Sequence, residues 1–179
     1  MRIISGKYRG RRINPPTGFK ARPTTDFARE SLFNILSVRY TFEELSVLDL
    51  FSGTGCVGIE FASRGCPRVD MVENNFRHFS FIRKTLSTLD LPGSRVFHSN
   101  VKSFIKGADI TYDIVFADPP YDLEWLGDIP ALILESGILN DSAVFILEHP
   151  KNLHFGNHPN FSEHRKYGNV NFTFFTLSY

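Results

Sequence analysis

The sequence has few of the residues that build disulfides or metal centres. Its 179 residues include two cysteines, Cys56 and Cys66, and neither has a histidine or another cysteine at metal-ligand spacing. Regularly spaced cysteines mark disulfide frameworks and zinc sites, and that pattern is missing here. We therefore expect a reduced, cytoplasmic protein that binds no metal.

Long apolar runs are equally scarce. The longest stretches, such as residues 112–117 and 143–147, are far shorter than the roughly 20 residues that cross a bilayer. Residues 1–7 also lack the apolar segment of a signal peptide. What the chain has instead is an ordinary globular composition, with 42% hydrophobic residues and 18 Phe. We expect one domain with an aromatic-rich core, and nothing in the sequence demands more than a monomer.

Acidic residues are missing from the first 25 positions. This segment carries seven basic residues, namely Arg2, Lys7, Arg9, Arg11, Arg12, Lys20 and Arg22. Subtracting their charge of +7 from the net charge of +1 leaves −6 for the rest of the chain. A basic arm on a mildly acidic body predicts an anionic partner in contact with the arm. A solvated or disordered arm is the alternative that charge alone leaves open.

Hydrophobic patterning divides the chain into alternating strands and helices. Residues 1–14 predict a basic β-hairpin, and a helix follows from Thr24 or Thr25 to about residue 38. Strands are predicted at 47–51, 68–73, 96–98, 112–117 and 143–147, and helices at 56–64, 75–89, 101–106 and within 123–135. Two more strands, 161–167 and 170–179, form a terminal antiparallel hairpin. The order predicts a three-layer α/β domain over residues 23–179 with a mostly parallel, seven-stranded sheet, after a hairpin extension over residues 1–22.

A glycine-rich loop follows the strand at 47–51. Gly53, Gly55 and Gly58 satisfy the spacing G-x-G-x-x-G, and Glu73 comes 20 residues after Gly53 at the end of the next strand. Glycines here let a ligand approach the backbone closely, and the acid can accept hydrogen bonds from ribose hydroxyls. The same pattern marks dinucleotide sites, so an NAD-dependent oxidoreductase is a candidate.

Asp49 favours a different cofactor. A carboxylate just before the loop would repel the pyrophosphate of a dinucleotide, whereas it would attract the ammonium and sulfonium groups of S-adenosylmethionine. We interpret the loop as an adenosylmethionine site. The structural alternatives are that Asp49 caps loop amides and that Glu73 is a surface acid in a turn. An oxidoreductase would also need a hydride-transfer acid or base, and we identify none.

The strand at 112–117 ends in Asp118-Pro119-Pro120-Tyr121. Two prolines remove backbone donors and leave carbonyls, Asp118 adds a carboxylate acceptor, and Tyr121 adds a flat ring. An aromatic amine is a poor nucleophile because its lone pair is delocalised into the base. Hydrogen bonds from its two N–H groups to Asp118 and the Pro119 carbonyl would localise that lone pair, while Tyr121 stacks on the base. The motif predicts methyl transfer to an exocyclic amine, and a proline-stiffened turn is the structural alternative.

Together these segments resemble a known family. They are MRIISGKYRGR (1–11), RPTTD (22–26), RESLFNIL (29–36), LDLFSGTG (48–55), DIVFADPPY (113–121) and KYG (166–168). In this order they resemble the bacterial family of small-subunit ribosomal RNA guanine-N2 methyltransferases. The glycine loop and the Asp-Pro-Pro-Tyr motif are shared by many amino-methyltransferases, so the N-terminal segment with Arg-Pro-Thr is the narrower signal.

The resemblance implies a Rossmann-like class I methyltransferase with an N-terminal β-hairpin. Such an enzyme transfers a methyl group from S-adenosylmethionine to the N2 of a guanine in 16S ribosomal RNA within an assembly particle, and leaves S-adenosylhomocysteine. It implies cofactor contacts at Asp49, Phe51, Gly53, Thr54, Gly55, Glu73, Asn74, Asn100 and Val101, and guanine contacts at Asp118, Pro119, Pro120 and Tyr121. The family usually has an aspartate at the adenine edge, where this chain has Asn100, so an uncharged acceptor would serve there.

The charged ends of the chain carry the remaining expectations. RNA contacts are expected at Arg2, Lys7, Arg9, Arg11, Arg12 and Arg22. Arg22, Thr24 and Arg29 could place phosphates or close over the cofactor, and the sequence does not decide between these roles. Near the other end, an extension of the RNA-facing surface is one interpretation of His154, His158, His164, Arg165 and Lys166, and ordinary exposed side chains are the one we favour. We expect core positions rather than a base platform at Phe172, Phe174 and Phe175.

Two rival functions remain. A DNA adenine-N6 methyltransferase would use the same tetrapeptide, but 179 residues leave no room for a separate target-recognition domain, and flipping a base from a duplex costs a few kcal/mol. A non-catalytic RNA-binding assembly factor could keep the fold. The intact Asp118-Pro119-Pro120-Tyr121 argues against that reading, because an inactive protein need not retain the acceptors.

Overall fold

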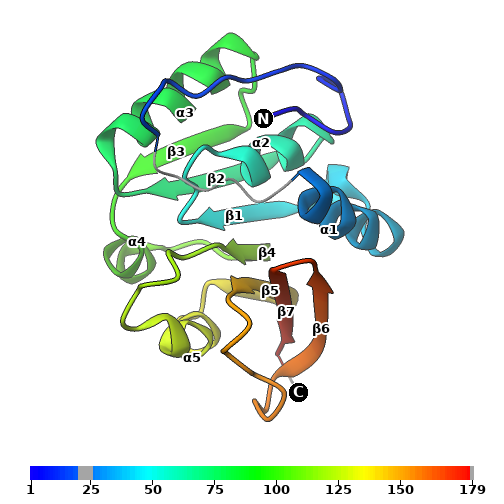
Figure 1. Cartoon of the computed structure of the whole chain (residues 1–179), viewed down its shortest axis with the longest axis vertical. Coiled ribbons are helices and arrows are strands. Elements are labelled where there is room, and N and C mark those ends of the chain that lie inside the picture. The colour runs from blue at the N-terminus through cyan, green and yellow to red at the C-terminus, as the bar shows by residue number, and fades with distance from the viewer. Residues whose placement is uncertain (20–25, 178–179) are drawn as a thin grey trace.

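A computed structural model describes residues 1–19 and 26–177, and its centre is one seven-stranded sheet of order β3-β2-β1-β4-β5-β7-β6 (Figure 1). The five parallel strands are β1 (Ser46–Leu50), β2 (Arg68–Glu73), β3 (Ser94–His98), β4 (Tyr112–Ala117) and β5 (Leu139–His149). Strand β7 (Val170–Thr176) runs antiparallel between β5 and β6 (Phe161–Tyr167). The predicted mostly parallel sheet with a terminal antiparallel hairpin is confirmed.

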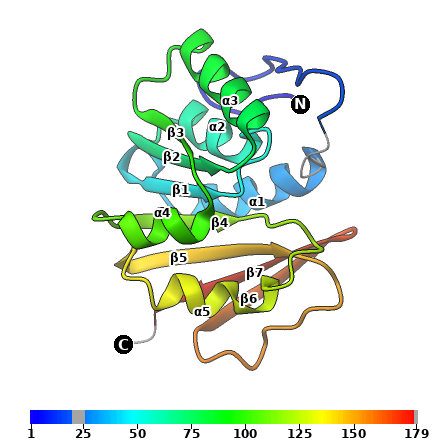
Figure 2. The same ribbon diagram turned by 90° about the vertical axis from the view of Figure 1, so that its left-hand side faces the viewer.

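Helices cover both faces of the sheet and create two hydrophobic cores (Figure 2). Helices α1 (Asp26–Arg39), α2 (Cys56–Ser63) and α3 (Phe76–Thr88) pack on one face, and α4 (Val101–Gly107) and α5 (Ile129–Leu134) on the other. Short 3-10 turns lie at η1 (Phe42–Glu44) and η2 (Leu126–Asp128). Phe172 and Phe174 enter the first core and Phe175 the second, as consecutive residues of a strand must, so all three are core residues as predicted.

Most of the predicted boundaries agree with the structure, and β5 is the main exception. The predicted strand, 143–147, began only after Asn140, Asp141 and Ser142, which interrupt the apolar run. These residues still belong to the strand, because Leu139 pairs with Tyr112 ahead of a bulge in the β4–β5 register. Polar residues are tolerated there since Asp141 and Ser142 are exposed. The strand is therefore twice as long as its apolar segment suggests.

The N-terminal segment folds back on itself as a short antiparallel hairpin. Its pairing is centred on one bridge, between Arg2 and Arg12, and is continued by backbone hydrogen bonds from the Ile3 amide to the Arg11 carbonyl (3.0 Å) and from the Ile13 amide to the Met1 carbonyl (3.0 Å). The segment is docked on α2, whose buried Glu60 accepts hydrogen bonds from the backbone amides of Ile4 (2.8 Å) and Ser5 (3.0 Å). Gly6 lies so close that an added Cβ would stand 1.8 Å from the carbonyl oxygen of Ser63. The arm is thus held against the domain and is not free in solvent.

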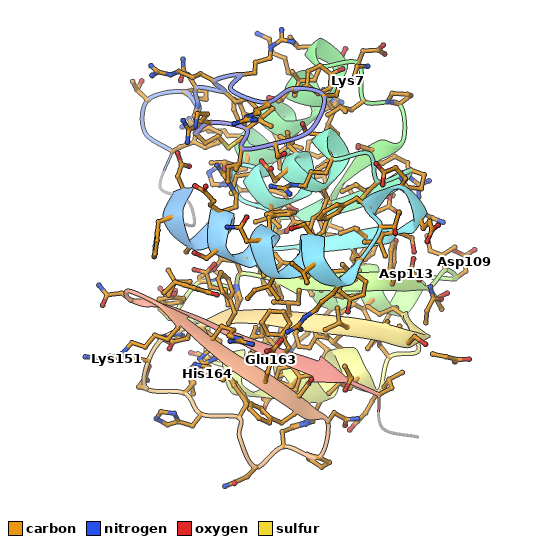
Figure 3. The ribbon with its side chains drawn as sticks, turned by 90° about the vertical axis from the view of Figure 1, so that its right-hand side faces the viewer. Lys7, Asp109, Asp113, Lys151, Glu163 and His164 are labelled. Atoms are coloured by element: carbon orange, nitrogen blue, oxygen red, sulfur yellow. The ribbon has the colours of Figure 1, made fainter. Side chains whose placement is uncertain are left out.

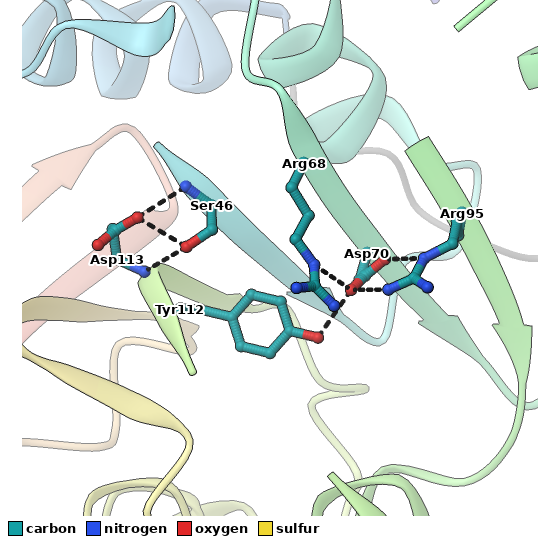
Figure 4. A network of polar contacts seen from close by, with 6 residues as sticks. All are labelled: Ser46, Arg68, Asp70, Arg95, Tyr112 and Asp113. Atoms are coloured by element: carbon teal, nitrogen blue, oxygen red, sulfur yellow. Dashed lines mark hydrogen bonds and ion pairs between the residues drawn. The ribbon is translucent and has the colours of Figure 1, made fainter. Parts of the chain in front are cut away.

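A buried acid ties together the amino ends of three strands (Figure 4). Asp70 on β2 accepts hydrogen bonds from Arg68 (3.1 Å), from Arg95 of β3 (2.8 Å) and from the Tyr112 hydroxyl of β4 (2.8 Å). Burial raises the pKa of Asp70, but the hydrogen bonds from Arg95 and Tyr112 outweigh it and hold that pKa below its usual value. The charged groups at the amino edge of the sheet are thus engaged with one another and stabilise the fold. The candidate site lies at the opposite, carboxyl edge.

An ion pair joins β6, an edge strand of the sheet, to helix α1. Figure 3 places Lys7 at one end, and Glu163 and His164 on β6 at the other. Glu163 forms ion pairs with Arg165 (2.7 Å) and with Arg39 of α1, so the β6 edge is linked to the helix that covers it. His164 and Lys166 are exposed, as predicted for this strand. In the ranges 1–19 and 26–177, no helix has both the length and the apolar character needed to cross a membrane.

Candidate active site

Three acids gather at the carboxyl edge of the sheet, on the face covered by α1, α2 and α3. Val47, Phe116 and Ile146 belong to the core of that face. Two residues further on, strand alternation places Asp49 on β1 and Glu148 on β5 on the same face. Asp118 continues this alternation one residue beyond β4. Because β1, β4 and β5 are neighbours, the three acids form a slanting row across the middle of the sheet, called here the acid row. Asp118 and Glu148 are level with each other, and Asp49, which pairs with Phe116, lies two residues before them.

The loop after β1 has the backbone that a close ligand requires. Phe51, Gly53 and Gly55 have positive φ angles of 59°, 55° and 73°. A Cβ at Gly58 would lie 2.6 Å from the Met71 side chain and 3.1 Å from Oδ2 of Asp49, so only glycine fits without displacement. The glycines predicted from spacing alone are therefore needed for the turn and for packing α2 against the sheet.

Asp49 is a buried carboxyl group at the base of this loop. Its side chain is 2% exposed and its Oδ2 accepts a hydrogen bond from the Gly58 amide at 2.9 Å. Burial raises the pKa of Asp49 to about 7, and the Gly58 amide opposes the rise. The residue does contact a loop amide, as the structural alternative held. A carboxyl group whose charge is this poorly solvated is also stabilised by any cation placed beside it.

Glu73 connects the loops that follow β1 and β2. Its Oε2 accepts from the Gly53 amide at 2.8 Å and its Oε1 from the Asn75 amide at 2.6 Å. The side chain is buried, so Glu73 is not a surface acid in a turn. Each carboxylate oxygen has a second lone pair, so both can still accept hydrogen bonds from ribose hydroxyls. Asn74, next in the chain, is exposed at the same edge.

The third loop of this edge begins at the end of β3. Asn100 is the N-cap of α4, where its Oδ1 accepts from the Ser103 amide at 2.8 Å, and its side chain is exposed. Val101 is buried beneath it. Capping uses one lone pair of the carbonyl that was expected to serve the adenine edge. Loops after β1, β2 and β3 thus bring the expected cofactor residues to one side of the acid row.

The Asp118-Pro119-Pro120-Tyr121 segment continues from β4 and starts in the middle of the acid row. Pro119 is buried, while Pro120 and Tyr121 are exposed, with 43% of Tyr121 accessible. The Asp118 amide donates to the Leu50 carbonyl at 3.4 Å, which holds the segment beside β1. The Tyr121 ring is accessible for stacking, and its hydroxyl reaches Oε1 of Glu148 at 3.4 Å.

Glu148 is a site residue that sequence reasoning missed. It is 4% exposed and stands beside Asp118 in the parallel register, since Ala117 pairs with Leu147. The available signal was its position: an acid that follows an apolar strand two residues after Ile146, on the same face as Asp49 and Asp118.

Arg29 was a candidate from the sequence, which left its role open. It is 1% exposed on α1, where it donates to Asp26 at 2.8 Å and to the Arg2 carbonyl. Its Nε, though buried, has no hydrogen-bond partner in the described part of the chain. Burial raises the pKa of the Cys56 thiol, and the charge of Arg29 partly offsets that rise. This shows that Arg29 lies near Cys56, the first residue of α2. The signal was helical spacing, with Leu32, Phe33 and Leu36 three, four and seven residues further along.

These groups fit adenosylmethionine better than a dinucleotide. The cofactor has an ammonium, a carboxylate and a ribose, and the loop offers the buried Asp49, the unpartnered Arg29 Nε and Glu73. A pyrophosphate would meet Asp49 instead of a cation. Among residues 1–19 and 26–177 no group of three or more histidine, cysteine or acidic side chains could hold a metal ion.

The arm that carries the residues expected to contact RNA touches the glycine loop directly, where the Thr54 hydroxyl donates to Sδ of Met1 at 3.6 Å. Arg2, Lys7, Arg9, Arg11 and Arg12 are exposed, and none forms an ion pair with a described residue. Tyr8 lies between two of them, with the Lys7 ammonium 5.2 Å and the Arg11 guanidinium 5.9 Å from its ring centre. The carbonyl of Arg2 accepts from Arg29, so the arm touches α1 beside the glycine loop. Arg22 and Thr24 lie outside the described residues.

Comparison with known proteins decides the family. Residues 1–176 match the family model described as conserved hypothetical protein 95. Ribosomal RNA small subunit methyltransferase D of Escherichia coli K12 is 35% identical over 148 residues, which cover 83% of this chain and 74% of that protein. The chain belongs to the conserved hypothetical protein 95 family.

Solved structures agree with the family assignment. The putative methyltransferase yhhF from Escherichia coli superposes with a TM-score of 0.85 at 32% identity, covering 98% of this chain and 96% of that one. The Thermus thermophilus 16S rRNA N2 G1207 methyltransferase, solved with AdoMet and guanosine, superposes with a TM-score of 0.69 at 21% identity, covering 88% of this chain and 44% of that one. The fold of this family member is the class I methyltransferase fold, as expected.

Proposed function

We propose that this chain transfers a methyl group from S-adenosylmethionine to the exocyclic N2 of a guanine in 16S ribosomal RNA. The observation that carries the proposal is the acid row at the carboxyl edge. The cofactor-type loops follow β1, β2 and β3 at one end of this row, and Asp118-Pro119-Pro120-Tyr121 follows β4 in its middle. The relatives' names supply the substrate class, since they are ribosomal RNA small subunit methyltransferases. We further propose that the enzyme acts as a cytoplasmic monomer on a small-subunit assembly particle.

The residues of the tetrapeptide prepare the amine for attack. Asp118 and the Pro119 carbonyl accept the two N2–H bonds, which localises the nitrogen lone pair on the side facing the cofactor loops. Tyr121 stacks on the base, an interaction worth roughly 1–3 kcal/mol. As N2 gains its methyl group it becomes cationic and then loses a proton, which Asp118 can accept and pass to water. Asp118 need not be a strong base, because the proton is acidic by then.

The cofactor residues would hold the methyl donor beside that nitrogen. When bound, adenosylmethionine supplies an electrophilic methyl group on a sulfonium. Asp49 would hold the ammonium, Glu73 the ribose, Asn100 the adenine amine and Arg29 the carboxylate. The remaining contacts would come from Phe51, Thr54, Asn74 and Val101. Alignment of this kind can reduce a barrier by roughly 7–11 kcal/mol when it is well oriented.

The basic arm supplies the RNA-facing surface in this proposal. Arg2, Lys7, Arg9, Arg11 and Arg12 present cations that other described residues leave unpaired, and Arg22 extends the same segment. Because Glu60 and Ser63 fix the arm on α2, these cations have defined positions relative to the loop after β1. The hairpin extension over residues 1–22 is proposed as a substrate-binding part of the enzyme and residues 23–179 as its methyltransferase domain.

Replacing Asp118 tests the amine-acceptor role. Asp118→Ala should lower the rate of methyl transfer to small ribosomal subunits that lack the modification by about a hundredfold or more, the usual effect of removing one positioned hydrogen-bond partner. Adenosylmethionine affinity, measured by calorimetry, should change little, because the residue faces the base. Asp109→Ala, at an exposed acid on the amino edge, is the matched control. Turnover within tenfold of wild type would show that Asp118 is not the acceptor.

A further inference from the structure

Glu148 has a position that the proposed transfer reaction does not yet explain. Its carboxylate is buried on β5, next to Asp118 in register and in contact with the Tyr121 hydroxyl at 3.4 Å. Neighbouring strands lie about 4.8 Å apart, so the backbones at Asp118 and Glu148 are separated by roughly one base edge. A second carboxylate therefore faces the place where the target base meets its amine acceptors.

The chemistry of the two purines decides what such a pair of acids can bind. Guanine presents two neighbouring kinds of donor on its Watson–Crick edge, the N1–H and the N2 amine. Adenine presents one amine, and its N1 is an acceptor with an exposed lone pair. An ionised carboxylate accepts hydrogen bonds and donates none. Two adjacent carboxylates thus complement guanine, whereas one of them would face the lone pair of adenine.

We propose that Glu148 reads the N1–H of the target guanine and is the residue that selects guanine over adenine. The proposal rests on the proposed function and adds its specificity: Asp118 accepts from N2, Glu148 accepts from N1, and the Tyr121 hydroxyl orients the Glu148 carboxylate while its ring stacks. Sites that hydrogen-bond a particular substrate group discriminate strongly against analogues that lack it, because buried polar groups are then left unpaired. This explains how a tetrapeptide shared by enzymes acting on different amines can serve a guanine here.

Glu148 also has a structural neighbourhood, so the test needs a readout that packing alone would not change. Its strand pairs with β7, where Glu148 stands opposite Phe172. A purely structural role would lower stability and slow transfer to every substrate by the same factor. A reading role would change the ratio between guanine and 2-aminopurine, which differ at N1 and at the C6 oxygen. The C6 difference is the same for wild type and variant, so a change of the ratio on replacing Glu148 reports on N1.

The experiment compares guanine with 2-aminopurine at the methylated position. 2-Aminopurine keeps the exocyclic amine at C2, but its N1 accepts instead of donating. The methylated nucleotide is first mapped with the wild-type enzyme. Small subunits are then assembled on 16S RNA carrying guanine or 2-aminopurine there, and kcat/KM is measured for both. Wild type should prefer guanine by about a hundredfold or more. Glu148→Gln should reduce that preference at least tenfold, because an amide can donate to the N1 of 2-aminopurine.

Two variants and one control keep the result interpretable. Glu124→Gln, an exposed residue, should keep the wild-type preference. Glu148→Asp retains a carboxylate and should keep a preference for guanine at a lower rate, which covers the case in which Glu148→Gln fails to fold. An equal rate on both substrates with wild type, or an unchanged preference in folded Glu148→Gln, overturns the proposal. If wild type transfers no methyl group to the guanine particle, the proposed function fails instead.

Discussion

At the scale of single residues, Asp49 serves binding at the expense of stability. Its pKa of about 7 exceeds the ordinary value of 3.8 because burial disfavours the charge. A carboxyl group with a raised folded pKa contributes stability that is fully present below the unfolded pKa and is lost as pH rises through the folded one. Near pH 8 the ionised group therefore destabilises the free protein, and a bound ammonium relieves that cost.

Asp49→Asn should separate these two effects. The variant should bind adenosylmethionine at least tenfold more weakly at pH 7.5, yet its melting temperature at pH 8 should exceed that of wild type by about 2 °C or more. The difference in melting temperature should become small near pH 4, where the Asp49 carboxyl is neutral in the folded protein and only partly ionised in the unfolded one. Wild-type affinity should also rise between pH 6 and pH 7.5, and the variant's should rise less. A variant that is less stable than wild type at pH 8 would contradict the assigned environment of Asp49.

Arg29 makes a complementary prediction about the cofactor's carboxylate. A buried guanidinium with an unpartnered Nε gains most from an anion. Wild type should bind adenosylmethionine about ten- to a hundredfold more tightly than decarboxylated adenosylmethionine, in line with a charge-assisted hydrogen bond. Arg29→Met should remove most of that difference, whereas Arg39→Met on the same helix should preserve it. Calorimetry with both ligands gives the ratio, and equal affinities in wild type would remove Arg29 from the cofactor site.

At the scale of elements, sequence patterns located the parallel core well and its flanks less well. Strands β2, β4 and β6 begin and end where alternation and apolar runs predict, and Asn75 caps α3 as its position suggests. The first part of β5 was not predicted, because its residues are polar. Pairing with β4, and not hydrophobicity, keeps them in the strand. The N-terminal hairpin pairs only over its first three residues, because the next amides, those of Ile4 and Ser5, donate to Glu60 on α2 instead of to the returning segment.

The candidate site, too, was predicted in part from the sequence. The glycine loop, Glu73 and Asp118 were predictable because each follows a recognisable strand with fixed spacing. Glu148 was missed because its significance depends on β5 lying next to β4, a long-range fact that local pattern does not contain. Arg29 was left undecided because its partners come from the arm and from α2, which are distant in the sequence.

At the scale of the whole molecule, charge is separated between an anchored basic arm and an acidic body. Replacing Arg9, Arg11 and Arg12 by Ala should weaken RNA binding and reduce the slope of log affinity against log salt by up to about 2, at roughly 0.7 per lost single-strand phosphate contact. Filter binding of 16S RNA across a salt series measures the slope. Replacing Lys84 and Lys106, exposed lysines on α3 and α4, should leave it nearly unchanged. An unaltered slope in the arm variant would remove the arm from the RNA interface.

The central claim concerns what receives the methyl group. The most direct measurement is transfer of labelled methyl from adenosylmethionine to three substrates: small ribosomal subunits lacking the modification, naked 16S RNA, and duplex DNA. The account predicts label on the ribosomal substrates, recovered after digestion as N2-methylguanine, and none on DNA. Label recovered as N6-methyladenine from DNA, or no transfer to any substrate by protein that still binds the cofactor, would contradict it.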